Sequence, residues 1–166
     1  MRGMIETYNR QAISCDGQDA AIDRDPTAIS WSRGLVADAL RGRTHTFKPD
    51  RVYRSLYRPF TGQWAYFDRP LNDMVYRLDS VFPTPRHVNM GISVIAPHPQ
   101  AQFAVLMLDA LPDVATYTYT AQFFPRWTYE KPGIADQDSL LDATADVDEW
   151  GYRRIDNITD EILALY

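Results

Sequence analysis

The sequence predicts an α+β fold: a single mixed domain over residues 1–166, with a central strand-rich sheet, mostly antiparallel or mixed, flanked by a few helices. Its 166 residues and 45% hydrophobic content match one ordinary globular domain. Short apolar, β-branched and aromatic runs gather in the middle of the chain, where they favour strands. Apolar residues at helical spacing precede these runs.

The first expected helix begins near Trp31, with Ser30 as its N-cap, and stops near Gly42. Its apolar face would consist of Leu35, Val36, Ala39 and Leu40. An aromatic segment at 52–67 follows, broken at 59–62 by a turn signal, so that 63–67 is expected to be a strand. A short helix is expected over 72–78.

Further strands are expected over 90–96, 103–108, 116–119 and 122–129. The Asp-rich stretch 133–149 has little periodicity and is expected to be an exposed acidic loop. Asn157 or Thr159 is a plausible cap for a last helix from about residue 158. Fewer than about two turns remain after this cap, which favours a longer helix cut short and hence a fragment.

Several classes of protein are disfavoured. The longest apolar run, 103–108, is too short to span a bilayer, and the first residues lack the apolar core of a signal peptide, so we expect a cytoplasmic protein with no membrane partner. Cys15 is the only cysteine and is expected to be a small buried hydrophobe.

No catalytic motif is complete. The sequence has no phosphate-binding glycine loop and no Gly-x-Ser-x-Gly nucleophile motif, and its three histidines lack metal-ligand spacing. The acidic stretch also lacks the pattern of a calcium loop. We therefore expect no catalytic residues, no metal and no cofactor. A hydrolase using Asp109 and Asp113 is a weaker hypothesis, because their spacing defines no shared face.

The net charge of −5 argues against a nucleic-acid partner, but its distribution does not. Residues 33–87 contain ten basic and five acidic residues, whereas 130–166 contains three basic and ten acidic ones. Arginines alternate with aromatic residues over 53–69, a composition suited to phosphate neutralisation and base stacking. The alternative is that these aromatics form the core and arginine stems cover its rim; those aromatics are Tyr57, Phe60, Trp64 and Phe67.

A series of segments, in this order along the chain, resembles the C-terminal specificity region of type ISP restriction–modification enzymes. The segments are 25–35, 56–60, 66–69, 71–76, 82–85, 103–107, 111–113, 122–125 and 157–160. The resemblance implies a target recognition domain for duplex DNA, separated here from the nuclease, helicase-like ATPase and adenine-N6 methyltransferase of the parent enzyme. It does not identify the residues that contact bases.

Those residues are chosen on chemistry. Arginine can bind phosphate or form paired hydrogen bonds with guanine, and amide side chains can pair with adenine. The candidates are Arg54, Arg58 and Arg69 for guanine or phosphate, Gln63, Asn72 and Asn89 for adenine, and Arg77, Arg86 and His87 for phosphate. A turn or cap role is equally open for Asn72. The alternative function is a scaffold domain whose aromatic segments dock onto the methyltransferase or helicase portion of the parent enzyme.

Overall fold

The computed structural model describes residues 1–113, 116–117, 119–132 and 147–165. Most of the expected acidic loop, residues 133–146, lies outside this range. The chain forms two compact units: unit 1 comprises Met1–Val52 and Tyr66–Val75, and unit 2 comprises Tyr53–Ala65 and Tyr76–Tyr166. Each unit is described by itself, and a single domain over 1–166 stays a prediction. Among the described residues, no helix is both long and apolar enough to cross a bilayer.

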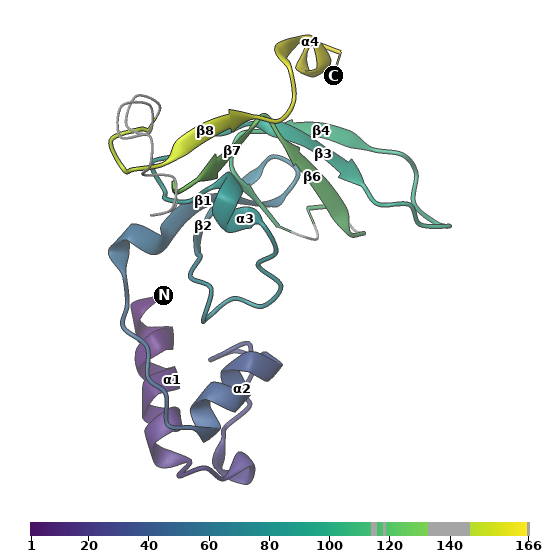
Figure 1. The fold of residues 1–166 in the computed structure, drawn as a ribbon. Coiled ribbons are helices and arrows are strands. Elements are labelled where there is room, and N and C mark those ends of the chain that lie inside the picture. Colours follow the sequence, from purple (N-terminus) through teal and green to yellow (C-terminus); the bar gives the residue numbers. More distant parts are fainter. Residues whose placement is uncertain (114–115, 118, 133–146, 166) are drawn as a thin grey trace. The chain divides into compact units, whose positions relative to one another are not determined.

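Unit 1 is helical. Helices α1 (Arg2–Ser14) and α2 (Arg33–Leu40) pack together, and the short 3-10 helices η1 (Asp19–Ala21) and η2 (Pro49–Arg51) lie in the connections (Figure 1). Their shared core consists of Tyr8, Ala12, Cys15, Ile22, Ile29, Leu35 and Ala39. Cys15 is 1% exposed, which confirms its prediction as a small buried hydrophobe.

The second helix has the stop that the sequence predicts and a start two residues later than expected. The Ser32 hydroxyl, not that of Ser30, accepts a hydrogen bond from the Leu35 amide at 3.1 Å. Gly42 ends the helix with a φ of 65°, a conformation that glycine adopts without steric cost. Helix α1 was not predicted, although Ile5, Tyr8 and Ala12 have helical spacing and are buried.

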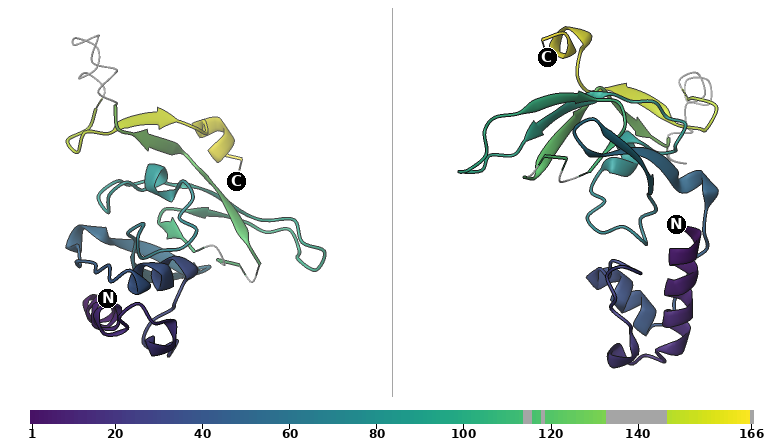
Figure 2. Two further views of the ribbon diagram at one scale, coloured as in Figure 1. Left: turned by 60° about the horizontal axis from the view of Figure 1, so that its bottom comes forward. Right: turned by 180° about the vertical axis from the view of Figure 1, so that it is seen from behind.

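The described strands lie in unit 2, except for two of their residues, Val52 and Tyr66, which belong to unit 1. These strands form three small sheets. One sheet has the order β2-β1-β5, with β1 (Val52–Arg58), β2 (Thr61–Tyr66) and β5 (Leu111–Pro112). The second has the order β4-β3-β6, with β3 (Gly91–Ile95), β4 (Val105–Leu108) and β6 (Ala121–Pro125). The third pairs β7 (Trp127–Glu130) with β8 (Arg153–Asp156). Two further views show β3 and β4 extending together into a long connecting loop (Figure 2).

The α+β class is confirmed, but the strands are divided among three sheets instead of one central sheet. The pairing differs between the sheets: β1 pairs with β5 in parallel, while β3 is antiparallel to both β4 and β6 and β7 is antiparallel to β8. Arg126 interrupts the single strand expected over 122–129 and separates β6 of the second sheet from β7 of the third.

Two local predictions are wrong. The helix expected over 72–78 is absent, because Met74 and Tyr76 have positive φ angles of 52° and 50°, which no right-handed helix permits. Helix α3 (Leu78–Val81) begins where the expected helix was to end. The described residues of 116–119 are not strand; the Thr116 hydroxyl instead donates to the Asp113 carbonyl at 2.6 Å.

The expected last helix is present as α4 (Asp160–Leu163), and of its two proposed caps Thr159 is the one used. The Thr159 hydroxyl accepts a hydrogen bond from the Ile162 amide at 3.4 Å. Arg126 joins this helix to the third sheet: its guanidinium lies 2.8 Å from a carboxylate oxygen of Asp160 and 3.0 Å from one of Asp156.

Candidate nucleic-acid interface

The β1–β2 hairpin separates its side chains into an inner and an outer set. Tyr53 and Ser55 point inward and are 2% and 4% exposed, and the Tyr53 hydroxyl donates to the Pro83 carbonyl at 3.1 Å. Arg54 and Arg58, offset by one residue from this set, are exposed. The two-residue period of a strand therefore places the arginines on the outside of the hairpin.

Three aromatic residues of this hairpin are exposed. Phe60 is 88% exposed, Trp64 68% and Tyr57 45%, whereas Phe67 is only 7% exposed. The alternative in which all four form the core is therefore correct for Phe67 alone. We call six exposed residues of the hairpin the hairpin surface: Arg54, Tyr57, Arg58, Phe60, Gln63 and Trp64.

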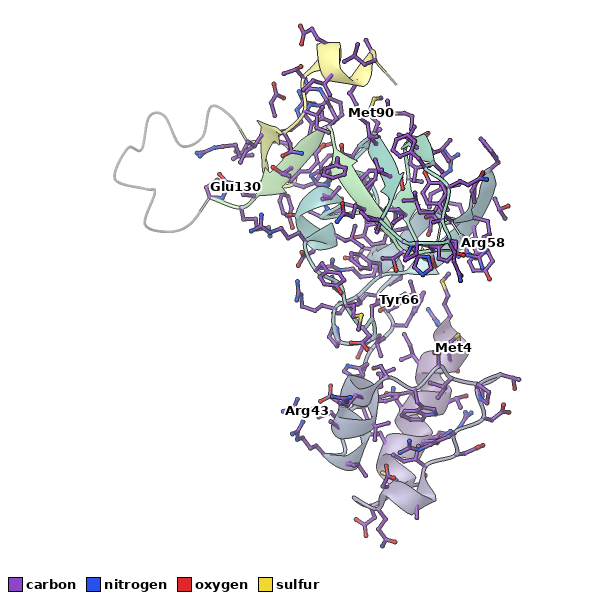
Figure 3. All side chains as sticks on the ribbon, turned by 90° about the vertical axis from the view of Figure 1, so that its right-hand side faces the viewer. Met4, Arg43, Arg58, Tyr66, Met90 and Glu130 are labelled. Carbon is purple, nitrogen blue, oxygen red and sulfur yellow. The ribbon has the colours of Figure 1, made fainter. Side chains whose placement is uncertain are left out.

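The hairpin surface is basic. Residues 52–66 contain two arginines and no acidic residue. The guanidinium of Arg58 lies 4.6 Å from the centre of the Tyr57 ring, an arrangement that holds the charge beside an aromatic face. Arg54 lies 3.9 Å from Asp109, but both side chains are more than 60% exposed, so this pair competes weakly with an incoming phosphate. Arg58 and Glu130, where β7 ends, lie on opposite sides of unit 2 (Figure 3).

Six predicted residues lie outside the hairpin: Arg69, Asn72, Arg77, Arg86, His87 and Asn89. Arg77 and Arg86 are exposed and belong to unit 2, so phosphate contact remains open to them. Arg69 and Asn72 belong to unit 1. The Asn72 side-chain oxygen accepts a hydrogen bond from the Asp68 amide at 2.8 Å, which supports its alternative role in a turn.

The structure gives Asn89 another role than contact with adenine. The side chain is 0% exposed, and its amide group donates to the carbonyls of Val81 and Trp127 at 2.9 and 2.8 Å. Its oxygen accepts from the amides of Met90 and Trp127 at 2.9 and 3.3 Å. With its hydrogen-bonding groups used inside unit 2, Asn89 is not available to a base.

His87 is likewise buried, with 1% of its side chain exposed, and it cannot reach a phosphate. Its Nδ1 lies 2.8 Å from the Thr84 hydroxyl, and its Nε2 lies 2.8 Å from a carboxylate oxygen of Asp148. Both ring nitrogens of His87 are thus engaged inside unit 2.

The contact with His87 has a consequence for the pH dependence of stability. Burial alone would raise the pKa of Asp148, but hydrogen bonds from the Tyr152 amide, His87 and the Trp150 amide together hold it below its ordinary value. A carboxyl whose pKa is lowered by folding stabilises the fold above its unfolded-state pKa of about 4, and this contribution is lost as the pH falls through the folded-state value.

We therefore expect Asp148→Asn to lower the urea midpoint at pH 7 and to differ less from the unchanged chain as the pH is lowered toward 3. Urea denaturation at a series of pH values measures this difference. Glu149→Gln removes the same charge from the exposed neighbouring residue and is the matched control. A difference between Asp148→Asn and the unchanged chain that stays constant over this range would contradict the prediction.

Sequence reasoning left one feature of the site undecided, the exposure of Phe60 and Trp64. The Pro59-Phe60 pair at a turn signal was the available clue, because residues at the tip of a hairpin are seldom buried. Among the described residues, no group of three or more His, Cys, Asp or Glu side chains is arranged to hold a metal ion.

The family model described as the type ISP C-terminal specificity domain matches residues 1–166. The chain belongs to this family. The match covers both compact units and the hairpin surface, and it confirms the resemblance found in the sequence. Among curated proteins, none matches the chain significantly.

Solved structures similar to this type ISP specificity domain are DNA complexes. The ATP-dependent type ISP restriction–modification enzyme LlaBIII bound to DNA is 26% identical with a TM-score of 0.76, over 99% of this chain and 10% of that one. A nuclease-deletion mutant of the type ISP enzyme LlaGI in complex with a DNA substrate mimic is 28% identical with a TM-score of 0.78, over 99% and 15%. A DrdV–DNA complex is 26% identical with a TM-score of 0.71, over 99% and 14%. The chain thus spans 10–15% of the length of these proteins.

Proposed function

We propose that this chain is a DNA target recognition domain that binds duplex DNA in a sequence-specific manner and catalyses no reaction itself. The observation that carries the proposal is the membership of the whole chain in a specificity-domain family whose similar solved structures are bound to DNA. In the parent enzyme, the ATPase, nuclease and adenine-N6 methyltransferase would reside in other parts of the polypeptide, and those parts would be the protein partners of this domain.

The hairpin surface is the part of the described structure that we assign to DNA contact. Arg54 and Arg58 are exposed and lie on one strand without a neighbouring acidic residue in the hairpin, which suits phosphate binding or paired hydrogen bonds to guanine. Gln63 is exposed on the adjacent strand and has the donor and acceptor that adenine requires. Arg77 and Arg86 are assigned to phosphate positioning.

The test is the salt dependence of binding, measured by fluorescence anisotropy with a labelled duplex selected by the full chain from a random library. The affinity of the unchanged chain should fall steeply with salt concentration, because bound phosphates release counterions. An affinity for duplex DNA that is independent of salt would refute the proposal. Preference for the selected duplex over a shuffled one measures sequence specificity.

Removing both arginines should change the salt dependence in a defined way. If Arg54 and Arg58 each neutralise one phosphate, Arg54→Ala/Arg58→Ala lowers the affinity and reduces the slope of log affinity against log salt by about 1.8. Arg10→Ala, which removes an exposed charge from α1, is the control and should leave affinity and slope unchanged. An unchanged slope in the double variant would remove these two residues from the interface.

One observation favours the scaffold function as a second candidate. Across the β4-β3-β6 sheet, Met107 and Phe124 flank Ile92 on the same face, and they are 38% and 45% exposed. Two partly exposed apolar side chains on either side of the buried Ile92 form an apolar surface of the kind found at protein contacts. Sedimentation of the isolated chain measures this candidate: self-association that is abolished by Met107→Lys would support it, and a monomer at all concentrations would argue against it.

A further inference from the structure

Phe60 occupies the tip of the β1–β2 hairpin. The strands end at Arg58 and resume at Thr61, so the turn consists of Pro59 and Phe60 alone. The Phe60 side chain is 88% exposed, the largest exposed fraction among the exposed large hydrophobic residues of the described chain. A bare aromatic ring at a projecting tip gains nothing from burial within the folded chain.

The backbone at this position is one that a bulky residue rarely adopts. Phe60 has a φ of 65°, in the left-handed region where a Cβ atom is crowded by the backbone. Proline followed by a residue of positive φ is the pattern of a turn in which glycine or asparagine is preferred at the second position. Phenylalanine therefore neither packs well nor fits this turn, and such a departure is typical of a residue retained for contact with a ligand.

The surroundings of Phe60 indicate what that ligand is. Arg58 lies two residues before it and carries its guanidinium beside the Tyr57 ring, while Trp64 on the returning strand is 68% exposed. The tip thus presents an apolar aromatic ring with a cation at its base. Duplex DNA offers the complementary chemistry, with stacked apolar base faces inside and anionic phosphates at the rim.

We propose that Phe60 is a wedge that enters the duplex between adjacent base pairs and partly unstacks them, while Arg58 binds a flanking phosphate. This inference rests on the proposed DNA-recognition function and adds a contact that deforms the DNA. Apolar side chains inserted at a base step kink the duplex and allow more of the protein surface to reach it. Sequence preference would then come partly from the ease of unstacking each step, without a hydrogen bond to its bases.

The decisive variant is Phe60→Gly in the full chain, because a wedge predicts opposite effects on stability and binding. Glycine relieves the left-handed backbone and removes an exposed ring, so the thermal midpoint should be equal to or higher than that of the unchanged chain. The affinity for the selected duplex should fall by about 5- to 150-fold, the range expected for the loss of one aromatic–base stack. A residue with a purely structural role would lower the thermal midpoint instead.

Two further variants serve as controls. Phe103→Ala removes a phenylalanine of similar exposure, 75%, from the β3–β4 loop and should leave the DNA affinity unchanged. Phe60→Trp keeps an aromatic wedge and should restore most of the affinity lost in Phe60→Gly.

Unstacking itself is measured with 2-aminopurine, a base analogue whose fluorescence rises when it leaves the stack. A set of selected duplexes, each with the analogue at a different position, should show a rise confined to one base step with the unchanged chain and no rise with Phe60→Gly. Lost affinity in Phe60→Gly without any fluorescence rise in the unchanged chain would overturn insertion, since Phe60 would then touch only the groove or the backbone.

The remaining outcomes distinguish a failure of the Phe60 wedge from a failure of the proposed DNA-recognition function. The unchanged chain could bind DNA in a salt-dependent way while Phe60→Gly keeps the same affinity. This result would overturn the wedge but not DNA recognition, and it would indicate that the Phe60 ring contacts a protein partner instead. Absence of salt-dependent binding by the unchanged chain would overturn both.

Discussion

Gly91→Ala is expected to destabilise the protein by about 3 kcal/mol, near the upper end of the usual cost of overpacking. A Cβ atom at Gly91 would lie 2.7 Å from both the Phe123 ring and the Pro125 Cα, and it would also meet the Phe124 carbonyl oxygen. Gly91 is paired with Pro125 across the β3–β6 ladder, so relief of these contacts requires one strand to move away from the other. Because two of these contacts are with backbone atoms, a change of side-chain rotamer cannot relieve the overlap.

The measurement is the free energy of unfolding from urea denaturation followed by tryptophan fluorescence. Three of the four tryptophans, Trp64, Trp127 and Trp150, belong to the same unit as Gly91 and report on its unfolding. Gly62→Ala is the matched control, because a Cβ atom there meets nothing within 4 Å, and its effect should stay within about 0.5 kcal/mol. Equal stabilities of the two variants would show that the sheet spacing at Gly91 is not close enough to exclude a methyl group.

Asn89→Leu is expected to destabilise the protein by a similar amount, about 3 kcal/mol or more. Leucine has the same number and branching of side-chain heavy atoms as asparagine, but it is larger and provides no donor or acceptor. The carbonyls of Val81 and Trp127 and the amides of Met90 and Trp127 would each lose a hydrogen bond in a site that is closed to water. An unsatisfied buried polar group costs about 1–3 kcal/mol, although such contributions do not add fully when the groups share one partner.

Asn157→Leu provides the comparison for Asn89. The Asn157 side chain is exposed and donates to the Pro125 carbonyl at 2.8 Å, so water can replace its hydrogen bond and the cost should be about 1 kcal/mol or less. Urea denaturation of both variants gives the two values side by side. If Asn89→Leu lowered the free energy of unfolding no more than Asn157→Leu, the hydrogen bonds of Asn89 would not be a main contribution to the packing of β3, α3 and β7. Retention of DNA affinity per folded molecule in Asn89→Leu would further agree with a structural role.

Part of the hairpin surface could be predicted from the local sequence, and part could not. A turn at 59–62 and the strand after it were predicted from a proline, a glycine and aromatic residues, whereas the strand before it, β1, was not predicted. The two-residue period of β1 also places Arg54 and Arg58 together on one face. What the period could not tell was which face is buried, because Tyr57 and Trp64 suit a core as well as a surface. Tyr57 shares the two-residue spacing of Tyr53 and Ser55 but is 45% exposed, so only the tertiary structure decided its exposure and that of Trp64.

The failed helix over 72–78 has a different cause. Its residues include Val75 and Leu78 at helical spacing, but Met74 and Tyr76 take positive φ angles in the folded chain. Val75 is 6% exposed, so its burial is satisfied by a loop instead of a helix. Propensity over seven residues is a weak preference, and packing of a single apolar side chain into unit 1 is sufficient to override it.

The sequence alone determined the features that depend on neighbours along the chain: the α+β class, the stop of α2 at Gly42, the hairpin turn, the strands β3 and β4, and the family. Only the tertiary structure decided which polar residues are buried and which are exposed. Asn89 bonds to Trp127, 38 residues away, and His87 to Asp148, 61 residues away. A polar side chain is buried or exposed according to such distant partners, and no pattern of adjacent residues specifies them.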